Sequence, residues 1–345
     1  MSVSKKVTTT VPITDAIVAT FQPSKALAGH DGASITSLDF DDSGQYLVSA
    51  GVDKSIQVYD CYKGTRHIEV PSQKYGAHLA KFTHSYECLY ASTPLVGTAD
   101  PDHSIRYLAL STKSYLRYFK GHKDQVLQLE VNPVSDQFIT SSADHTVKNW
   151  DLRLSAPTGS IGVSSACIVA SDPRGIVFAT AATVDGSKGT VSFYDGAAYE
   201  KGPFLVSEIP AGGEKWTKLE FSNNGRYLLI GTDSYKHYVL DAILGKLLTN
   251  LVVQGLRSWP ALDYSTTGCV CFTPDGKLVM AGMSNGNISV FDLLVLKAST
   301  EKVDLRPYTI LRSDATAAKI LAFNPKLLTF ASADDQVVLW STNHE

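Results

Sequence analysis

The sequence has no long hydrophobic run and few cysteines. Its 345 residues contain no stretch of 18 consecutive apolar residues, so no membrane-spanning helix is predicted. Lys5 and Lys6 are not followed by an apolar run, which argues against a signal peptide. The cysteines number five, an odd count, and no CxxC pair occurs. These features favour buried free thiols in a reducing compartment, and we expect a soluble intracellular protein.

Catalytic and metal-binding patterns are also scarce. Gly186–Thr190 superficially resembles a phosphate loop but lacks the GxxxxGK[ST] spacing, so it indicates a surface turn. His67, His78, His84 and His103 are close in sequence, yet their spacing is not that of metal ligands. No HExxH motif occurs. We predict a protein that is not an enzyme and that uses no cofactor and no metal.

A short signature recurs along the chain. A strand-like run ends in an aromatic or aliphatic residue followed by Asp, at Tyr59-Asp60, Trp150-Asp151, Tyr194-Asp195, Leu240-Asp241 and Phe291-Asp292. The spacings between these copies are 91, 44, 46 and 51 residues. The double spacing hides a degenerate copy, Ser104–Leu108, and a last copy ends at Trp340 with Ser341 in the Asp position. Seven units of about 45 residues match the period of WD40 blades.

The segments between these signatures have the composition of strands and tight turns. Asp42–Gln45, Asn132-Pro133, Asn223–Gly225 and Pro274–Gly276 are turn sequences, since Gly and Asn accept positive φ and Pro presets φ. The flanking runs are rich in β-forming residues, and no long amphipathic helix separates them. The predicted fold is therefore all-β, a seven-bladed WD40 β-propeller.

Two units carry a fuller WD40 signature. Gly29-His30 is followed by Asp53 and Tyr59, and Gly121-His122 is followed by Asp144 and Trp150. In WD40 proteins such His, Asp and aromatic side chains form a hydrogen-bonded network within a blade. We therefore interpret His30, Asp53, Tyr59, His122, Asp144 and Trp150 as structural, because buried polar groups require partners.

The two chain ends suggest how the ring closes. The seventh unit stops at Trp340, after its third strand, while a strand-like segment around Lys25–Ala28 has no unit of its own. Pairing of this N-terminal strand with the last blade would remove an open sheet edge. We predict a mobile tail over 1–14 and a single propeller over 15–345.

One segment is distinctly basic. Residues 61–123 contain nine Lys or Arg and four acids, a charge of +5, while the whole chain carries −3 and the remainder therefore −8. Seven of the 16 tyrosines also lie there. Basic and aromatic side chains together suit a phosphopeptide or single-stranded RNA. A solvated outer face with tyrosines in the blade cores explains the same composition. The candidate contacts are Arg106, Lys113, Arg117, Lys120 and Lys123.

Several stretches resemble a known WD40 family: 74–84, 104–122, 201–204 and 214–225. This family is the WD-repeat subunit shared by the COMPASS histone H3 lysine-4 methyltransferase and the cleavage and polyadenylation factor with its phosphatase module. The resemblance implies a nuclear scaffold whose partners are subunits of a SET-domain methyltransferase complex, polyadenylation and protein phosphatase subunits, and phosphorylated C-terminal repeats of RNA polymerase II. It implies roles in histone methylation and transcription termination. Direct nucleic-acid binding is not expected. The insert at 254–267 departs from the family pattern.

A second hypothesis concerns Trp150-Asp151-Leu152-Arg153. This tetrapeptide fits the WDxR pattern of propellers that serve as substrate receptors of cullin–RING ubiquitin ligases. In those proteins the arginine contacts the ligase adaptor, so Arg153 is the alternative contact residue. Many other propellers carry the same tetrapeptide with an arginine that is merely exposed.

Overall fold

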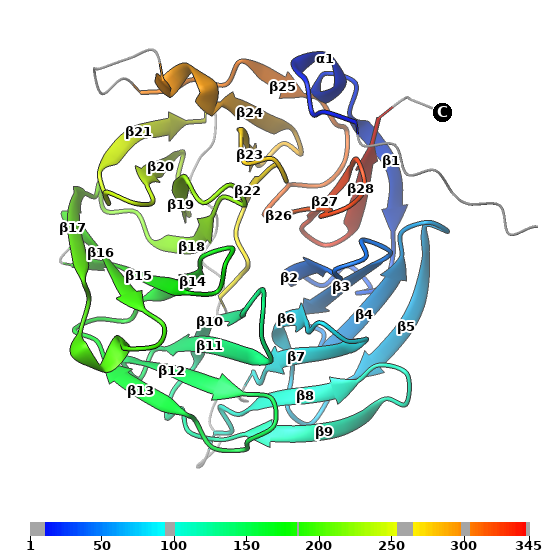
Figure 1. Cartoon of the computed structure of the whole chain (residues 1–345). Coiled ribbons are helices and arrows are strands. Elements are labelled where there is room, and N and C mark those ends of the chain that lie inside the picture. Colours follow the sequence, from blue (N-terminus) through cyan, green and yellow to red (C-terminus); the bar gives the residue numbers. More distant parts are fainter. Residues whose placement is uncertain (1–10, 94–100, 185, 254–264, 298–303, 343–345) are drawn as a thin grey trace, which may run out of the picture.

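The computed structural model describes residues 11–93, 101–184, 186–253, 265–297 and 304–342. In it, seven four-stranded antiparallel sheets are arranged around a central axis (Figure 1). The blades, numbered in chain order from the inner strand outward, are as follows. Blade one is β2 (Ile35–Phe40), β3 (Tyr46–Gly51), β4 (Ser55–Asp60) and β5 (Thr65–Pro71). Blade two is β6 (His78–Phe82), β7 (Glu87–Ala91), β8 (Ile105–Ala109) and β9 (Ser114–Phe119). Blade three is β10 (Val126–Val131), β11 (Gln137–Ser142), β12 (Thr146–Asp151) and β13 (Gly159–Gly162).

The remaining blades repeat this order. Blade four is β14 (Ile168–Ser171), β15 (Val177–Val184), β16 (Lys188–Asp195) and β17 (Leu205–Pro210). Blade five is β18 (Trp216–Phe221), β19 (Tyr227–Thr232), β20 (Lys236–Asp241) and β21 (Leu247–Val252). Blade six is β22 (Val270–Phe272), β23 (Leu278–Gly282), β24 (Ile288–Asp292) and β25 (Thr309–Leu311). Blade seven is β26 (Ile320–Phe323), β27 (Thr329–Ala333), β28 (Val337–Ser341) and β1 (Gln22–Leu27). The short helices are α1 (Asp15–Val18), η1 (Tyr199–Lys201) and η2 (Leu293–Lys297).

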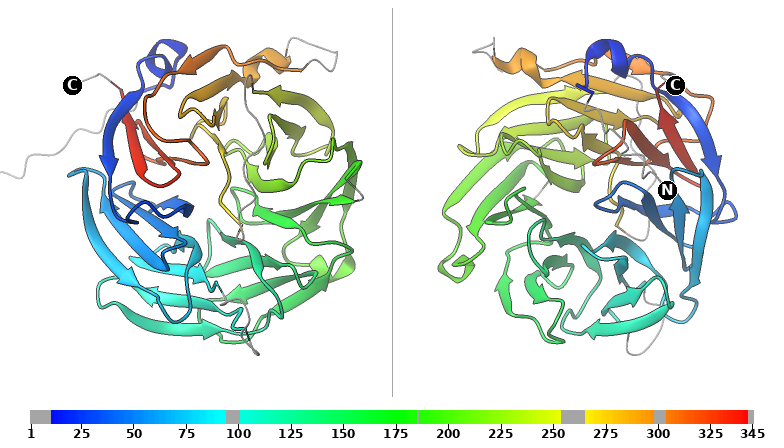
Figure 2. Two further views of the ribbon diagram at one scale, coloured as in Figure 1. Left: turned by 180° about the vertical axis from the view of Figure 1, so that it is seen from behind. Right: turned by 45° about the vertical axis from the view of Figure 1, so that its right-hand side comes forward.

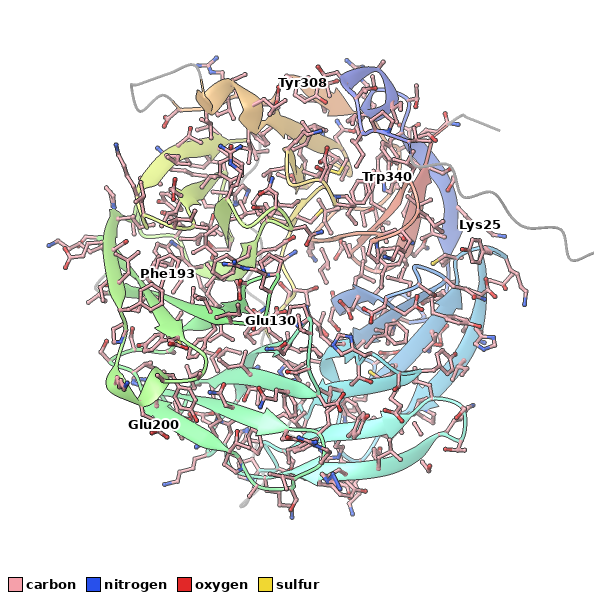
Figure 3. All side chains as sticks on the ribbon, viewed as in Figure 1. Lys25, Glu130, Phe193, Glu200, Tyr308 and Trp340 are labelled. Carbon is pink, nitrogen blue, oxygen red and sulfur yellow. The ribbon has the colours of Figure 1, made fainter. Side chains whose placement is uncertain are left out.

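The ring closes through the two chain ends, as predicted. β1 pairs antiparallel with β28, with Gln22 opposite Ser341 and Leu27 opposite Val337. A bulge between Pro23 and Lys25 accommodates the proline, and Ser24 Oγ donates to the carbonyl of Leu339 over 3.0 Å. Lys25 lies at the outer rim of this blade, while Trp340 lies inside it (Figure 3). The N-terminal strand therefore covers the edge that β28 would otherwise expose.

The predicted boundary between tail and propeller, after residue 14, lies close to residue 11, where the described residues begin. Residues 1–10 lie outside the described residues. Thr14 caps α1 through its side chain, and Ile13 packs against the apolar cluster between blades six and seven. The division into 1–14 and 15–345 stays a prediction.

The aspartate of the repeated signature caps a turn. Asp241 Oδ1 accepts hydrogen bonds from the amides of Ile243 and Leu244, each over 2.8 Å, directly after the third strand of blade five. Asp60, Asp151, Asp195 and Asp292 accept from the equivalent amides of their own blades. The carboxylate thus satisfies backbone donors where the chain turns toward the outer strand. Blade two has Ala109 and blade seven Ser341 at this position.

Apolar residues pack mainly between neighbouring blades. The described residues form seven buried apolar clusters. One of these clusters joins Leu89 and Ile105 of blade two to Phe138 and Trp150 of blade three. Each blade is therefore stabilised by both neighbours, as in a closed ring of repeats. No helix among the described residues is long and apolar enough to cross a membrane.

The strand order gives the ring two distinct faces (Figure 2). We call the upper face the one with the turns between second and third strands and the links between blades; the lower face carries the other turns. On the lower face, neighbouring blades are joined by side chains. Asn324 Nδ2 donates to the carbonyl of Gly44 over 2.7 Å, which ties blade seven to blade one. Gly44 has a φ of 72°, and a side chain there would collide with Asn324.

Candidate interaction surfaces

Blade three contains a complete hydrogen-bonded network beneath the upper face. His122 Nδ1 lies 3.0 Å from Asp144 Oδ2, and its Nε2 lies 2.7 Å from Thr140 Oγ1. Trp150 Nε1 donates to the same Thr140 oxygen over 2.8 Å. His122 and Trp150 are buried, so these side chains tie β11 and β12 to the loop before the blade and present little surface to a partner.

Blade one repeats the contacts of the histidine with an aspartate and a hydroxyl, with different residue types. His30 Nδ1 lies 3.0 Å from Asp53 Oδ1, and Nε2 lies 2.7 Å from Ser49 Oγ. Tyr59 occupies the position of Trp150 and is fully buried, which raises the pKa of its hydroxyl to about 12. Ser55 hydrogen-bonds Asp53 from the following strand.

Protonation in blade three follows from burial and hydrogen bonding. Burial lowers the pKa of His122 below its usual range, although Asp144 opposes this effect. Burial alone would raise the pKa of Asp144, but hydrogen bonds from Thr146, the Lys123 amide and His122 bring it to about 2. The pair is therefore a neutral imidazole beside a carboxylate at neutral pH.

In blade two, an arginine takes the place of the histidine as the partner of the aspartate. Asp102 precedes Leu108 by six residues, the spacing of Asp144 from Trp150, and its Oδ2 lies 2.5 Å from Arg106 NH2. Arg106 is 1% exposed, also donates to Ser92 Oγ, and its guanidinium carbon lies 3.7 Å from the centre of the Tyr75 ring. Arg106 was predicted as a ligand contact, but it is buried, and NH1 and NH2 both donate hydrogen bonds within the blade. The basic composition of the surrounding segment suggested a ligand contact and gave no sign of this structural role. The six-residue spacing from Asp102 to Leu108, the same as from Asp144 to Trp150, was the available signal.

The other four predicted contacts do not form one cluster. Lys113 and Lys120 flank β9 at opposite ends, and seven residues of extended chain span roughly 23 Å. Lys113 lies in a lower-face turn with a φ of 53°. Arg117 is half-buried in mid-strand, and its NH1 donates to the carbonyl of Leu152 over 2.5 Å, which joins blades two and three. One phosphate group therefore cannot contact all of these cations.

Lys120 and Lys123 share the upper face between blades two and three. Both are exposed. Lys120 lines a cavity of about 300 Å³ with Asp102, His103 and His122. The Lys123 amide donates to Asp144 over 2.8 Å, which fixes the backbone of this loop on the blade-three network. We call the pair Lys120 and Lys123 the upper basic corner.

Arg153 lies on the lower face and is exposed. Its side chain folds back onto Asp151 of the same tetrapeptide, with Nε 2.8 Å from Oδ1 and NH2 2.6 Å from Oδ2. The hydrogen bond from Arg153 is the main reason that the pKa of Asp151 is lowered to about 2. An adaptor that contacts this guanidinium would have to share it with Asp151.

A stretch of blade six crosses the central channel. The Thr267 amide donates to the Thr36 carbonyl over 3.1 Å, and Thr267 Oγ1 accepts from the Leu38 amide over 3.2 Å. The chain before β22 thus reaches the inner strand of blade one (Figure 1). Of the predicted insert 254–267, residues 254–264 lie outside the described residues. Ser265, Thr266 and Gly268 line an upper cavity of about 380 Å³, and Thr267 lines a lower cavity of about 340 Å³.

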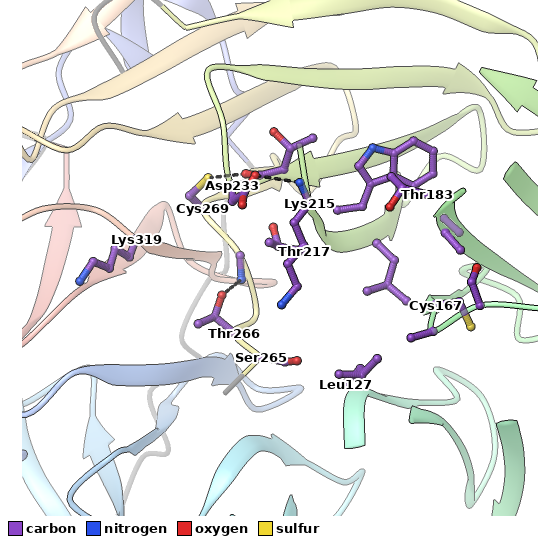
Figure 4. A pocket seen from close by; sticks show the side chains of 18 residues that line it. Leu127, Cys167, Thr183, Lys215, Thr217, Asp233, Ser265, Thr266, Cys269 and Lys319 are labelled. Carbon is purple, nitrogen blue, oxygen red and sulfur yellow. Dashed lines mark hydrogen bonds between the residues drawn. The ribbon is translucent and has the colours of Figure 1, made fainter. Parts of the chain in front are cut away.

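The upper cavity combines apolar walls with polar groups (Figure 4). Leu127 and Cys167 contribute apolar surface, and the side chain of Lys215 extends toward the middle of the cavity (Figure 4). Lys319 also lines it but is ion-paired with Asp334 at 2.5 Å. A cavity of this size and lining could accept a single side chain or a short peptide.

A serine pattern associated with hydrolases does not form a catalytic site here. Gly282–Gly286 has the letters GxSxG. In hydrolases that pattern forms a strained turn from a strand into a helix. Here it connects the antiparallel strands β23 and β24 of blade six, and no helix follows. The geometry is that of an ordinary turn between strands.

Comparisons with known proteins agree with the architecture. The WD domain, G-beta repeat, matches residues 21–60, 113–151 and 265–292. The chain is 37% identical over 324 residues to the COMPASS component SWD2 of Saccharomyces cerevisiae, covering 93% of both chains. It is 31% identical to the Set1 complex component swd2 of Schizosaccharomyces pombe, covering 96% of this chain and 100% of that protein. It is also 31% identical to WD repeat-containing protein 82 of Drosophila melanogaster, covering 97% and 98%.

Proposed function

The chain belongs to the WD-repeat family of COMPASS component SWD2 and WD repeat-containing protein 82, and from this membership we propose that it is a non-catalytic scaffold subunit of a nuclear COMPASS-type histone H3 lysine-4 methyltransferase complex. The observation that carries the proposal is the similarity along nearly the whole length of the relatives. A fold shared in isolation would not support it, because propellers serve many functions.

The architecture suits a scaffold. A closed ring keeps its upper and lower faces in a fixed relation, so two partners can bind at once without competing. The buried networks of blades one, two and three hold those faces rigid while contributing little surface themselves. The SET-domain subunit would supply the chemistry, and this chain would supply attachment surfaces.

Affinity purification of the tagged chain from nuclear extract, followed by mass spectrometry, tests this proposal. We expect SET-domain methyltransferase subunits to be recovered, and the purified chain alone to transfer no methyl groups to histone H3. Recovery of a cullin–RING ligase that is lost on Arg153→Ala, without methyltransferase subunits, would contradict the proposal.

We further propose that the chain serves the cleavage and polyadenylation machinery, its phosphatase module and transcription termination. The same purification should then recover polyadenylation and protein phosphatase subunits. Their absence from an eluate that contains the methyltransferase would restrict the chain to one assembly.

Phosphorylated C-terminal repeats of RNA polymerase II are the third proposed partner. The upper basic corner supports this proposal, since two exposed lysines suit a phosphate of nearly two negative charges. The contacts should be weak and sensitive to salt, because exposed charges are screened.

Fluorescence anisotropy with labelled repeat peptides tests the upper basic corner. Lys120→Glu/Lys123→Glu should abolish the preference for phosphorylated peptide, with a change in unfolding free energy within about 0.5 kcal/mol. Lys113→Glu, at the far end of β9, is the matched control and should bind normally. Equal affinity for phosphorylated and unmodified peptide, or unchanged binding by the double variant, would refute this contact.

A further inference from the structure

The lower cavity is lined by seven equivalent positions, one from each inner strand. Each position lies two residues before the residue that starts a lower-face turn. The seven residues are Asp39, Lys81, Glu130, Ala170, Glu220, Cys271 and Ala322, and all of them line the cavity. Charged side chains come from blades one, two, three and five, and small ones from blades four, six and seven. This unequal distribution leaves open space beside the charges, and Glu130 lies near the middle of the ring (Figure 3).

The charges in this cavity do not balance. Lys81 Nζ lies 3.0 Å from Glu130 Oε2 and 3.8 Å from Asp39 Oδ1. Lys218 Nζ lies 2.9 Å from Glu220 Oε2 and also donates to a backbone carbonyl over 2.7 Å. Asp39, Glu130 and Glu220 are thus three carboxylates beside two ammonium groups, and the Asp42 carboxylate, which contacts His84, also lines the cavity. Burial raises the pKa of Asp39 to about 6, against the opposing effect of Lys81, so its negative charge is incompletely compensated.

Hydrogen-bond acceptors are also left over. Gln128 is 1% exposed, and its Nε2 donates to Glu130 Oε1 over 2.7 Å. Its Oε1 is buried, and no hydrogen-bond partner for it exists among the described residues. Asp39 Oδ1 is separated from Lys81 Nζ by more than hydrogen-bond distance. Asp39 lines the open space, and the Gln128 amide oxygen is buried in its wall, so a ligand rich in hydrogen-bond donors suits these groups.

We propose that the lower cavity binds a guanidinium group, the side chain of an arginine presented by a partner protein. A guanidinium carries five N–H donors and no acceptor, so it complements the Asp39 carboxylate and the excess negative charge of the cavity. The cavity volume of about 340 Å³ is ample for one such side chain. Phe40, Phe221 and Phe272 belong to the apolar clusters between the blades and make part of the cavity wall.

Three blocked pentapeptides that differ only in a central arginine, lysine or citrulline test the proposal by calorimetric titration of the full chain. Citrulline keeps the shape of arginine without its charge. The arginine peptide should bind at least about tenfold more tightly than the citrulline peptide, since charge-assisted hydrogen bonds are the stronger ones. Asp39→Asn and Glu220→Gln should each weaken arginine binding about tenfold, given the loss of one charge. Glu208→Gln is the matched control: this carboxylate is exposed on β17, away from the channel, and binding should not change.

Melting curves establish that each variant is folded. Should Asp39→Asn fail to fold, Glu220→Gln decides, because its amide oxygen can still accept from the Phe272 amide as Glu220 does. Equal binding of the arginine and citrulline peptides would overturn the proposal. Equal binding of lysine would refute the assignment to guanidinium, and an equal loss in Glu208→Gln would show a general charge effect in place of a site.

Discussion

Blades two and three keep the same aspartate but pair it differently. Asp144 of blade three contacts the neutral His122, whereas Asp102 of blade two contacts the permanently charged Arg106. The amide and the hydroxyl of Thr146 donate to Asp144, and those of Ser104, just before β8, donate to Asp102 in the same way. The blade thus requires a carboxylate at this point and a donor to hold it, and the donor can come from the loop before the blade or from the third strand itself.

The comparison separates two kinds of basic residue in one segment. Arg106 and Arg117 are engaged inside or between blades, while Lys120 and Lys123 reach solvent.

Removal of residues 1–28 should have the largest effect, because it deletes β1 but keeps His30. β28 would then expose the full edge that β1 covers, and the chain should aggregate or lose its cooperative thermal transition. Removal of residues 1–10 should leave the transition intact. Equal melting of both truncated chains would contradict closure by β1.

Trp150→Ala should destabilise the protein by about 3–5 kcal/mol in urea unfolding, since it opens a cavity in the best-formed blade. Trp150 is fully buried and stacks on Phe138 with ring centres 5.8 Å apart. The folded fraction should still recover the methyltransferase subunits. A variant that stays fully stable but loses a partner would make Trp150 a contact residue.

Arg106→Gln should cost about 2–3 kcal/mol of unfolding free energy. Breaking a buried ion pair costs about 3–5 kcal/mol, and the 39% exposure of the Asp102 side chain reduces this figure. His122→Ala, which removes the corresponding partner of Asp144, should cost about 1–3 kcal/mol. Asp102→Asn added to Arg106→Gln should recover part of the loss, because no unpaired charge remains. If Arg106→Gln were as stable as the parent but failed to bind phosphorylated repeats, Arg106 would be a ligand contact after all.

Acid should destabilise the protein through His237. This side chain is fully buried, its Nδ1 accepts from the Thr232 amide over 3.1 Å, and burial lowers its pKa to about 3. The unfolded chain takes up the proton near pH 6.5, so the contribution to stability is complete above that pH and is lost as the pH falls toward 3. The loss approaches about 1.4 kcal/mol per pH unit. His237→Asn, whose Oδ1 can accept the same bond, should show a shallower decline between pH 6.5 and 4; an unchanged slope would refute this role.

Sequence reasoning predicted the parts of the fold that have a local signal. The spacing of the aspartates from Asp60 to Asp292 predicts seven blades, because each aspartate caps a turn at the same point of the repeat. The unassigned strand near Lys25 predicts the closure, because a ring must pair its last edge.

The surfaces were harder to predict because they depend on contacts distant in sequence. Charge density alone could not distinguish buried Arg106 from exposed Lys120. Asp39, Glu130 and Glu220 come from three blades and gather only when the ring forms. Their shared position two residues before a turn was the available signal, and it becomes visible once the blades are aligned.

Histone H3 lysine-4 methylation in cells depleted of this chain tests the central claim most directly. We expect methylation to fall on depletion and to return when the wild-type chain, or the folded variant Lys120→Glu/Lys123→Glu, is supplied. Methylation that stays at its normal level after complete depletion would contradict a scaffold role in the methyltransferase complex.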